Sequence, residues 1–173
     1  MNQTVRNFVV IDSIHGPFVI NRHCALQAEA LIKTGRPHIQ AELDTILQVI
    51  DQLPDGAIAV DGGANAGLVC VPIAHRLRAR SGRVYAFEPQ RTLFHALGGT
   101  IALNELDNLH LLNMGLASAN GTMKVPDIVR CPTSTMGRMP ISVRYRSSTA
   151  KRRAARRRRS PGSIRSACRG WIS

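Results

Sequence analysis

Two acidic residues follow two short apolar runs at a spacing that suits a nucleotide-type ligand. Asp61 ends the run Ala59-Val60 and opens a glycine-rich turn, and Glu88 ends the later run Val84–Phe87. In parallel α/β sheets such ligands lie at the carboxyl ends of adjacent strands, where glycines let the backbone approach and an acid can bind two ribose hydroxyls. The pattern therefore predicts a strand, a tight turn, a helix and a second strand, with a cofactor site at the strand ends.

The turn itself differs from the G-x-G-x-x-G sequence of dinucleotide-binding proteins. It reads Asp61-Gly-Gly-Ala-Asn-Ala-Gly67, so Asn65 stands where a glycine is otherwise expected. Asn adopts positive φ more readily than most non-glycine residues. Asn65 can therefore take the backbone conformation that the turn requires.

These paired motifs resemble those of a known family. The turn is similar to the first motif of Rossmann-like S-adenosylmethionine (SAM) methyltransferases. With Phe87-Glu-Pro-Gln90 after it, and Asn104 within Ile101–Leu109, the chain resembles the FkbM family from about residue 21 to about residue 128. The resemblance implies a class I methyltransferase sheet of strand order 3-2-1-4-5-7-6, of which this chain supplies strands 3, 2 and 1 only. Strand 1, at Ile58–Val60, would then lie at an open edge with bare apolar side chains.

The same resemblance assigns roles to individual residues. The turn would wrap the amino-acid part of SAM, Asp61 would bind its ammonium group, Glu88 would accept both ribose hydroxyls and Gln90 would line the adenine side. Gly115 and Leu116, after the third strand, would also border the adenine. The expected reaction is O-methylation of a small-molecule or sugar acceptor. The candidate cofactor-binding residues are Asp61, Gly62, Gly63, Ala64, Asn65, Gly67, Glu88, Pro89, Gln90 and Asn104.

Simpler interpretations stay open for these residues. Asp61 could be a helix N-cap, Glu88 a surface acid and Asn104 a polar helix C-cap. No residue is assigned as a catalytic base, because each of the six histidines is interpreted first as a structural residue. The four cysteines lie far apart and form no C-x-x-C pair, which argues against a disulfide framework or a metal site.

Charge divides the chain sharply near Ile128. Residues 1–128 hold 10 basic and 11 acidic residues, whereas residues 129–173 hold 13 basic residues and no acid. A segment of low hydrophobicity and high net charge is predicted to be disordered. Read in another frame, Met136–Ser148 permits an apolar, acid-containing sequence, so an out-of-frame product is favoured over a basic arm for nucleic acid or an anionic surface.

The element pattern gives three expected regions. Residues 1–56 should form a β-hairpin (Asn7–Ile11 with Pro17–Ile20) and two helices, Cys24–Ile32 and His38–Leu53. Residues 57–128 should form the partial SAM-binding domain. Residues 129–173 should form the basic tail. The expected elements of the second region are strands at Ile58–Val60, Arg83–Phe87 and His110–Leu116, helices at Ala66–Arg78 and Thr92–Leu103, and pairing at Met123–Val125. Pro72 predicts a kink or a late start in the first of these helices.

Three functions remain open at this point. The first is a SAM-dependent methyltransferase that meets a small-molecule methyl acceptor. The second is an inactive, truncated remnant of such an enzyme, and the third is a nucleic-acid-binding protein acting through the Arg-rich tail. The sequence shows no secretory segment and no apolar run long enough to span a membrane, which predicts a cytoplasmic protein.

Overall fold

The computed structural model describes residues 7–126 and 140–147. It begins with the predicted hairpin, in which β1 (Phe8–Ile11) pairs antiparallel with β2 (Phe18–Asn21). Ser13 closes the turn between them, because its Oγ donates to the Gly16 carbonyl oxygen at 2.8 Å. Gly16 has a φ of +95°, which glycine adopts without steric cost.

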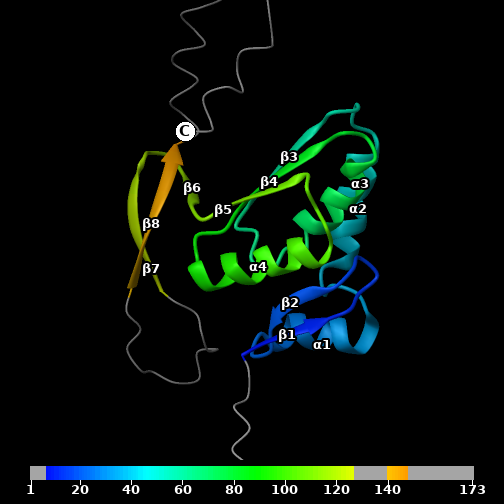
Figure 1. Ribbon diagram of the computed structural model, residues 1–173, viewed down its shortest axis with the longest axis horizontal. Coiled ribbons are helices and arrows are strands. Elements are labelled where there is room, and N and C mark those ends of the chain that lie inside the picture. Colours follow the sequence, from blue (N-terminus) through cyan, green and yellow to red (C-terminus); the bar gives the residue numbers. More distant parts are fainter. Residues whose placement is uncertain (1–6, 127–139, 148–173) are drawn as a thin grey trace, which may run out of the picture.

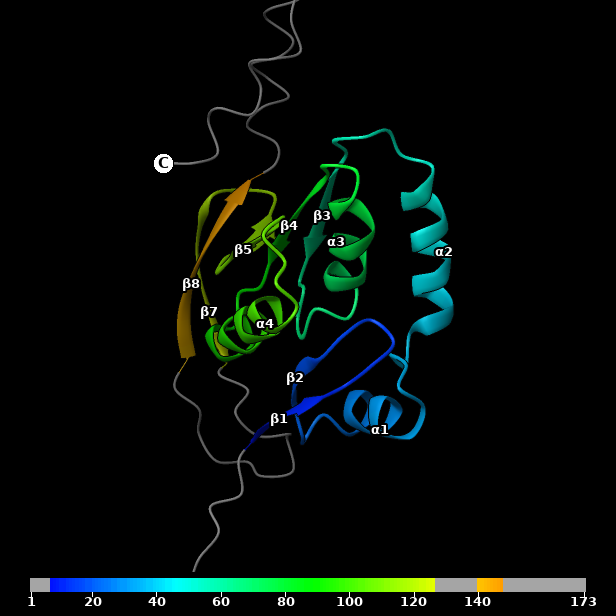
Figure 2. The same cartoon turned by 45° about the vertical axis from the view of Figure 1, so that its right-hand side comes forward.

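Two helices follow the hairpin, close to the predicted ranges. α1 (Ala25–Thr34) ends at Gly35, which has a φ of +65° and donates its N–H to the Leu31 carbonyl oxygen. α2 (Gln40–Asp51) buries Leu43, Leu47 and Ile50, as its apolar periodicity predicts. In Figure 2, α2 lies on the outer side of α3, so α2 adds a layer beyond the helix that covers the sheet, whereas α1 lies beside the hairpin.

The central sheet is parallel and has the order β3-β4-β5. Its strands are β3 (Ile58–Gly62), β4 (Arg83–Phe87) and β5 (Leu109–Leu112), joined by α3 (Cys70–Arg78) and α4 (Arg91–Leu103). This series confirms the predicted Rossmann-like α/β architecture, and Figure 1 shows β3 and β4 side by side with α4 below them. Because parallel strands share a direction, β3, β4 and β5 present their carboxyl ends at one edge.

α3 begins later than Ala66, the predicted first residue of this helix. The structure starts it at Cys70, which places Pro72 in its first turn. Proline has no N–H to donate, and the N–H groups of a first turn have no partner within the helix. The late start that Pro72 predicts is therefore what the structure adopts.

The predicted strand His110–Leu116 is wrong as a single element. The structure divides it into β5 and β6 (Gly115–Ala117), which belong to different sheets. The chain turns between them, where the Met114 N–H donates to the Leu112 carbonyl oxygen at 2.9 Å. Apolar pattern alone did not reveal this turn, because Leu111, Leu112, Met114 and Leu116 continue across it.

The expected disorder across residues 129–173 is corrected for one segment. β8 (Pro140–Ser147) pairs antiparallel with β7 (Gly121–Pro126) and parallel with β6, giving a second sheet of order β6-β8-β7. Figure 1 shows this sheet beside the central one. Ile141, Val143 and Tyr145 alternate with Ser142, Arg144 and Arg146, a period of two that favours a strand despite the charge. The rest of the tail lies outside the described residues.

One cluster of buried residues joins the hairpin, the helices and the sheet. It includes Phe18 from β2, Leu43 from α2 and Val84 from β4, each 0% exposed. The edge strand is different, since Ile58 and Val60 are 49% and 62% exposed. Within the described residues β3 pairs with β4 alone, so the predicted bare edge is present. No helix in the described part of the chain has the length and apolarity to cross a membrane.

Candidate cofactor site at the carboxyl ends of the sheet

The glycine turn after β3 adopts a left-handed backbone at three positions. Gly63 and Gly67 have φ values of +87° and +88°, and Asn65 has a φ of +50°. Asn65 therefore takes the conformation that its place in the motif predicts. The Gly63 and Ala64 N–H groups donate to the Phe87 carbonyl oxygen at 2.8 and 3.0 Å, which ties the turn to the end of β4.

Gly67 also serves the packing between the two helices that cover the sheet. A Cβ atom at this position would lie 2.5 Å from Leu97 Cδ1 of α4 and 3.1 Å from Val71 Cγ2 of α3. Both the positive φ and the close approach therefore require glycine here. At Gly63 the surroundings are open instead, because a Cβ atom would meet nothing within 4 Å. The turn thus combines a tightly packed end with a backbone that a ligand can approach.

Glu88 holds the turn from the neighbouring strand. Its Oε2 accepts the Asn65 N–H at 2.7 Å, and its Oε1 accepts the Gln90 N–H at 2.7 Å. The side chain is only 3% exposed, and burial raises the pKa of this carboxyl group. The two backbone N–H groups oppose that rise by stabilising the carboxylate. Glu88 is therefore a buried acid that links the glycine turn after β3 to the segment between β4 and α4. This excludes the alternative of a surface acid.

Asp61 lies at the end of β3 with part of its carboxylate unsatisfied. Its Oδ2 is buried and has no hydrogen-bond partner among the described residues. Burial raises the pKa of Asp61, while hydrogen bonds from the thiol and the N–H of Cys70 act in the opposite direction. Asp61 and Glu88 are close enough that the charge of Asp61 further raises the pKa of Glu88. A buried carboxylate with a free oxygen can accept a cationic partner.

Gln90 carries a second unsatisfied oxygen at the same edge. Its Oε1 is buried without a partner among the described residues, and its backbone forms the N-cap of α4. Pro89 lies between it and Glu88, so this short segment connects the end of β4 to α4. A third such oxygen within the described ranges belongs to Asn108, which precedes β5 at the opposite edge.

Asn113 belongs to this network, although the sequence did not point to it. It follows β5, and its Nδ2 donates to the carbonyl oxygens of Glu88 and Pro89 at 2.8 and 3.3 Å. A polar residue directly after an apolar strand was the signal available, since such positions reach the carboxyl edge of a parallel sheet. Leu116, which the resemblance places beside adenine, comes close to Gly62: a Cβ atom there would lie 3.0 Å from Leu116 Cδ1.

Asn104 is not brought to this site. It is the C-cap of α4, and its Nδ2 donates to the carbonyl oxygens of Pro17 and Thr100, both at 2.8 Å. α4 has 13 residues and so spans about 20 Å, with Gln90 at its other end. The structure therefore corrects the predicted cofactor contact of Asn104 and places this residue at the amino edge of the sheet, as the C-cap alternative describes.

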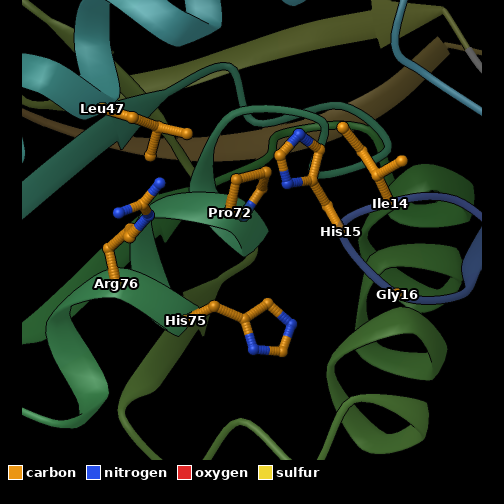
Figure 3. Close-up of a pocket in the computed structure, with 7 residues that line it drawn as sticks. All are labelled: Ile14, His15, Gly16, Leu47, Pro72, His75 and Arg76. Atoms are coloured by element: carbon orange, nitrogen blue, oxygen red, sulfur yellow. The ribbon is translucent and has the colours of Figure 1, made fainter.

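A separate hollow of about 430 Å³ lies between the hairpin turn, α2 and α3, and Figure 3 shows the seven residues that line it. His15 Nε2 lies 3.1 Å from Gln40 Oε1, and burial lowers the pKa of His15. His75 Nε2 lies 3.3 Å from Asn104 Oδ1, and Arg76 pairs with Asp51 at 3.1 Å. These side chains bind protein groups, away from the glycine turn. No cluster of metal-ligating side chains exists among the residues that the structure describes.

The comparisons with known proteins bear on the fold of this chain and not on its family. No family model matches the sequence, and no curated protein matches it. A SAM-dependent methyltransferase from Aquifex aeolicus matches with 20% identity and a TM-score of 0.37, over 49% of this chain and 42% of that one. Pyrococcus horikoshii TYW2 in complex with MeSAdo matches with 16% identity and a TM-score of 0.44, over 64% and 37%. A tRNA methyltransferase from M. jannaschii matches with 12% identity and a TM-score of 0.43, over 72% and 37%. The chain thus spans less than half the length of these three proteins.

Proposed function

We propose that the chain is a SAM-dependent methyltransferase of FkbM type that methylates an oxygen of a small-molecule or sugar acceptor. One observation carries this proposal. Two buried oxygens without partners among the described residues, Asp61 Oδ2 and Gln90 Oε1, belong to side chains at the carboxyl ends of β3 and β4. Buried polar atoms are normally hydrogen-bonded, so unsatisfied atoms at this edge point to a polar ligand.

The residues at this edge fit the parts of SAM. Asp61 supplies a carboxylate for the ammonium group, the exposed backbone at Gly62 and Gly63 admits the amino-acid part, and Gln90 Oε1 can accept the adenine amino group. Bound SAM would supply a methyl group on a sulfonium, which is the electrophile in methyl transfer. The chain's own contribution would be to hold that group in line with the acceptor oxygen.

Glu88 fits this ligand under one condition. Each carboxylate oxygen has two lone pairs, so both can accept a ribose hydroxyl in addition to a backbone N–H. Glu88 is 3% exposed, however, so the ribose can reach the carboxylate only if this side chain turns outward while its backbone stays in place. We therefore expect ligand binding to move the Glu88 side chain more than the packed end of the turn at Gly67.

Calorimetric titration of the full chain with S-adenosylhomocysteine tests the proposal. Asp61→Asn should weaken binding by at least about tenfold, because it removes the charge opposite the ammonium group. Asp55→Asn is the matched control, since the Asp55 side chain is 82% exposed and pairs with Arg80 away from the site. If the wild-type chain does not bind, or if both variants bind alike, this assignment is wrong.

A second candidate is a chain that binds the cofactor without catalysing transfer. The bare edge of β3 favours this candidate. Val60, on the strand that carries Asp61, is 62% exposed, as expected for a chain that supplies only part of the methyltransferase sheet. Incubation with methyl-labelled SAM and a panel of sugars and hydroxylated small molecules separates the candidates. Labelled product supports the enzyme, whereas cofactor binding with no product over the whole panel supports the second candidate.

A further inference from the structure

The side chain of Asn113 acts on the main chain of the segment that carries Glu88. Its Nδ2 donates to the carbonyl oxygens of Glu88 and Pro89, and its backbone follows the last residue of β5. The Glu88 N–H in turn donates to the Leu112 carbonyl oxygen at 3.0 Å. The start of this segment is therefore held from β5 by both a main-chain and a side-chain contact.

The same segment positions the glycine turn. The Glu88 carboxylate accepts the Asn65 N–H, and the neighbouring Phe87 carbonyl oxygen accepts the N–H groups of Gly63 and Ala64. A displacement of the Glu88 backbone would therefore move the turn as well. Asn113 lies at the start of this series of contacts, which runs from β5 through β4 to the loop after β3.

We propose that Asn113 is a positioning residue for the cofactor site, which fixes the Glu88–Gln90 segment so that Glu88 and the glycine turn face the ligand together. This inference rests on the proposed function. Asn113 is itself exposed and buries little surface, so its contribution to global stability is small. Its effect should fall on the geometry of the site.

The chain contains a matched control for this residue. Asn108 precedes β5 as Asn113 follows it, and its Nδ2 likewise donates to two main-chain carbonyl oxygens, those of Ala74 at 2.9 Å and Gly82 at 3.1 Å. The two residues thus have the same side chain and the same number of such bonds. They differ in which edge of the sheet they hold, since Asn108 lies at the amino edge.

The first experiment titrates the full-length variants with S-adenosylhomocysteine. Asn113→Ala should weaken binding by about tenfold, because the Glu88–Gln90 segment loses both side-chain donors that fix it, while Asn108→Ala should stay within about twofold of the wild type. Asn113→Gln keeps the amide and should restore part of the affinity. Equal effects of the two alanine variants on a binding-competent chain would overturn the inference and leave the proposed function intact.

The second experiment needs no ligand. Amide hydrogen exchange at Asn65 and Gln90, whose N–H groups bind Glu88, should be about tenfold faster in Asn113→Ala than in Asn108→Ala. Unchanged exchange at both amides would contradict the positioning role. If the wild-type chain fails to bind S-adenosylhomocysteine while exchange responds as expected, the proposed function is wrong, and what stands is that Asn113 fixes the Glu88–Gln90 segment. Should Asn113→Ala fold poorly, Asn113→Ser is measured in its place.

Discussion

The two ends of the central sheet are built in opposite ways. At the amino end, Arg80 donates to the carbonyl oxygens of Ile50, Asp51 and Leu53 and pairs with Asp55, and a Cβ atom on Gly82 would lie 2.9 Å from the Ala57 carbonyl oxygen. At the carboxyl end, Gly63 faces open space and the Asp61 carboxylate keeps an oxygen that no described residue satisfies. The closed end contributes stability, although a buried oxygen of Asn108 there also has no described partner, and the open end retains polar groups beside a backbone that a ligand can approach.

The largest expected effect on stability follows from substituting Gly67, and it tests whether the carboxyl end of the sheet also has a tightly packed part. Gly67→Ala should lower the free energy of unfolding by about 3 kcal/mol, because the new methyl group overlaps Leu97 and the backbone must keep a positive φ. Gly35→Ala is the control, since Gly35 has a φ of +65° but a Cβ atom there would meet nothing within 4 Å. Its cost should be about 1 kcal/mol. Urea denaturation of both variants measures the difference, and similar losses would argue against tight packing at Gly67.

The next prediction concerns the closed end alone. Arg80→Ala should lower the free energy of unfolding by roughly 1–2 kcal/mol, because it leaves several carbonyl oxygens without their donor. Affinity for S-adenosylhomocysteine should not change at a temperature where the variant stays folded. Chemical denaturation and calorimetry check the two parts. A marked loss of affinity in this variant would show that the two ends are coupled and would break the contrast between them.

The smallest expected effect is an increase in stability when Asp61, at the carboxyl end of the sheet, loses its charge. The folded-state pKa of Asp61 is raised, so its contribution to stability is fully present below the unfolded-state pKa and is lost as the pH rises through the folded-state pKa. As the pH rises above the unfolded-state pKa, this half-buried group therefore becomes unfavourable for folding. Asp61→Asn removes that charge and should stabilise the chain by about 1 kcal/mol while weakening ligand binding.

The pH dependence identifies the cause of this gain. The difference in melting temperature between Asp61→Asn and the wild type should shrink as the pH falls from 7 to about 4, near the ordinary pKa of Asp. Asp55→Asn, at an exposed position, should show almost no difference at any pH. A gain for Asp61→Asn that does not depend on pH would show that its buried charge is not responsible.

The sequence predicts much of this arrangement because the contacts are local. Short apolar runs beside glycines predicted β3 and β4, and the motif spacing predicted the left-handed conformation of Asn65. The placement of Asn104 was also within reach of the sequence. A helix of 13 residues that begins near Gln90 must end about 20 Å away, too far for Asn104 to join the same ligand contacts.

The features that the sequence did not predict depend on pairing between strands that lie far apart in the chain. The periodicity of apolar residues carries no information about which strands pair. Asn113 matters because β5 lies beside β4, so its amide meets the Glu88 carbonyl oxygen. β8 forms a strand beside β6 and β7. The high charge of this segment led to a prediction of disorder, although Ile141, Val143 and Tyr145 alternate with polar residues. Composition correctly identified the charge of that segment but did not determine its conformation.

The position of β8 has a consequence for how the chain folds. β6 and β7 are separated by only a few residues, yet each pairs with β8 and neither with the other. β7 and β8 are consecutive antiparallel strands and can pair as a hairpin, but β6 has a partner only once β8 is available. During synthesis the chain should thus pass through a stage in which β1 to β5 can associate while the second sheet still lacks its middle strand. Because β8 is the last of the described strands along the chain, we expect the second sheet to be the last part of the described structure to form during synthesis.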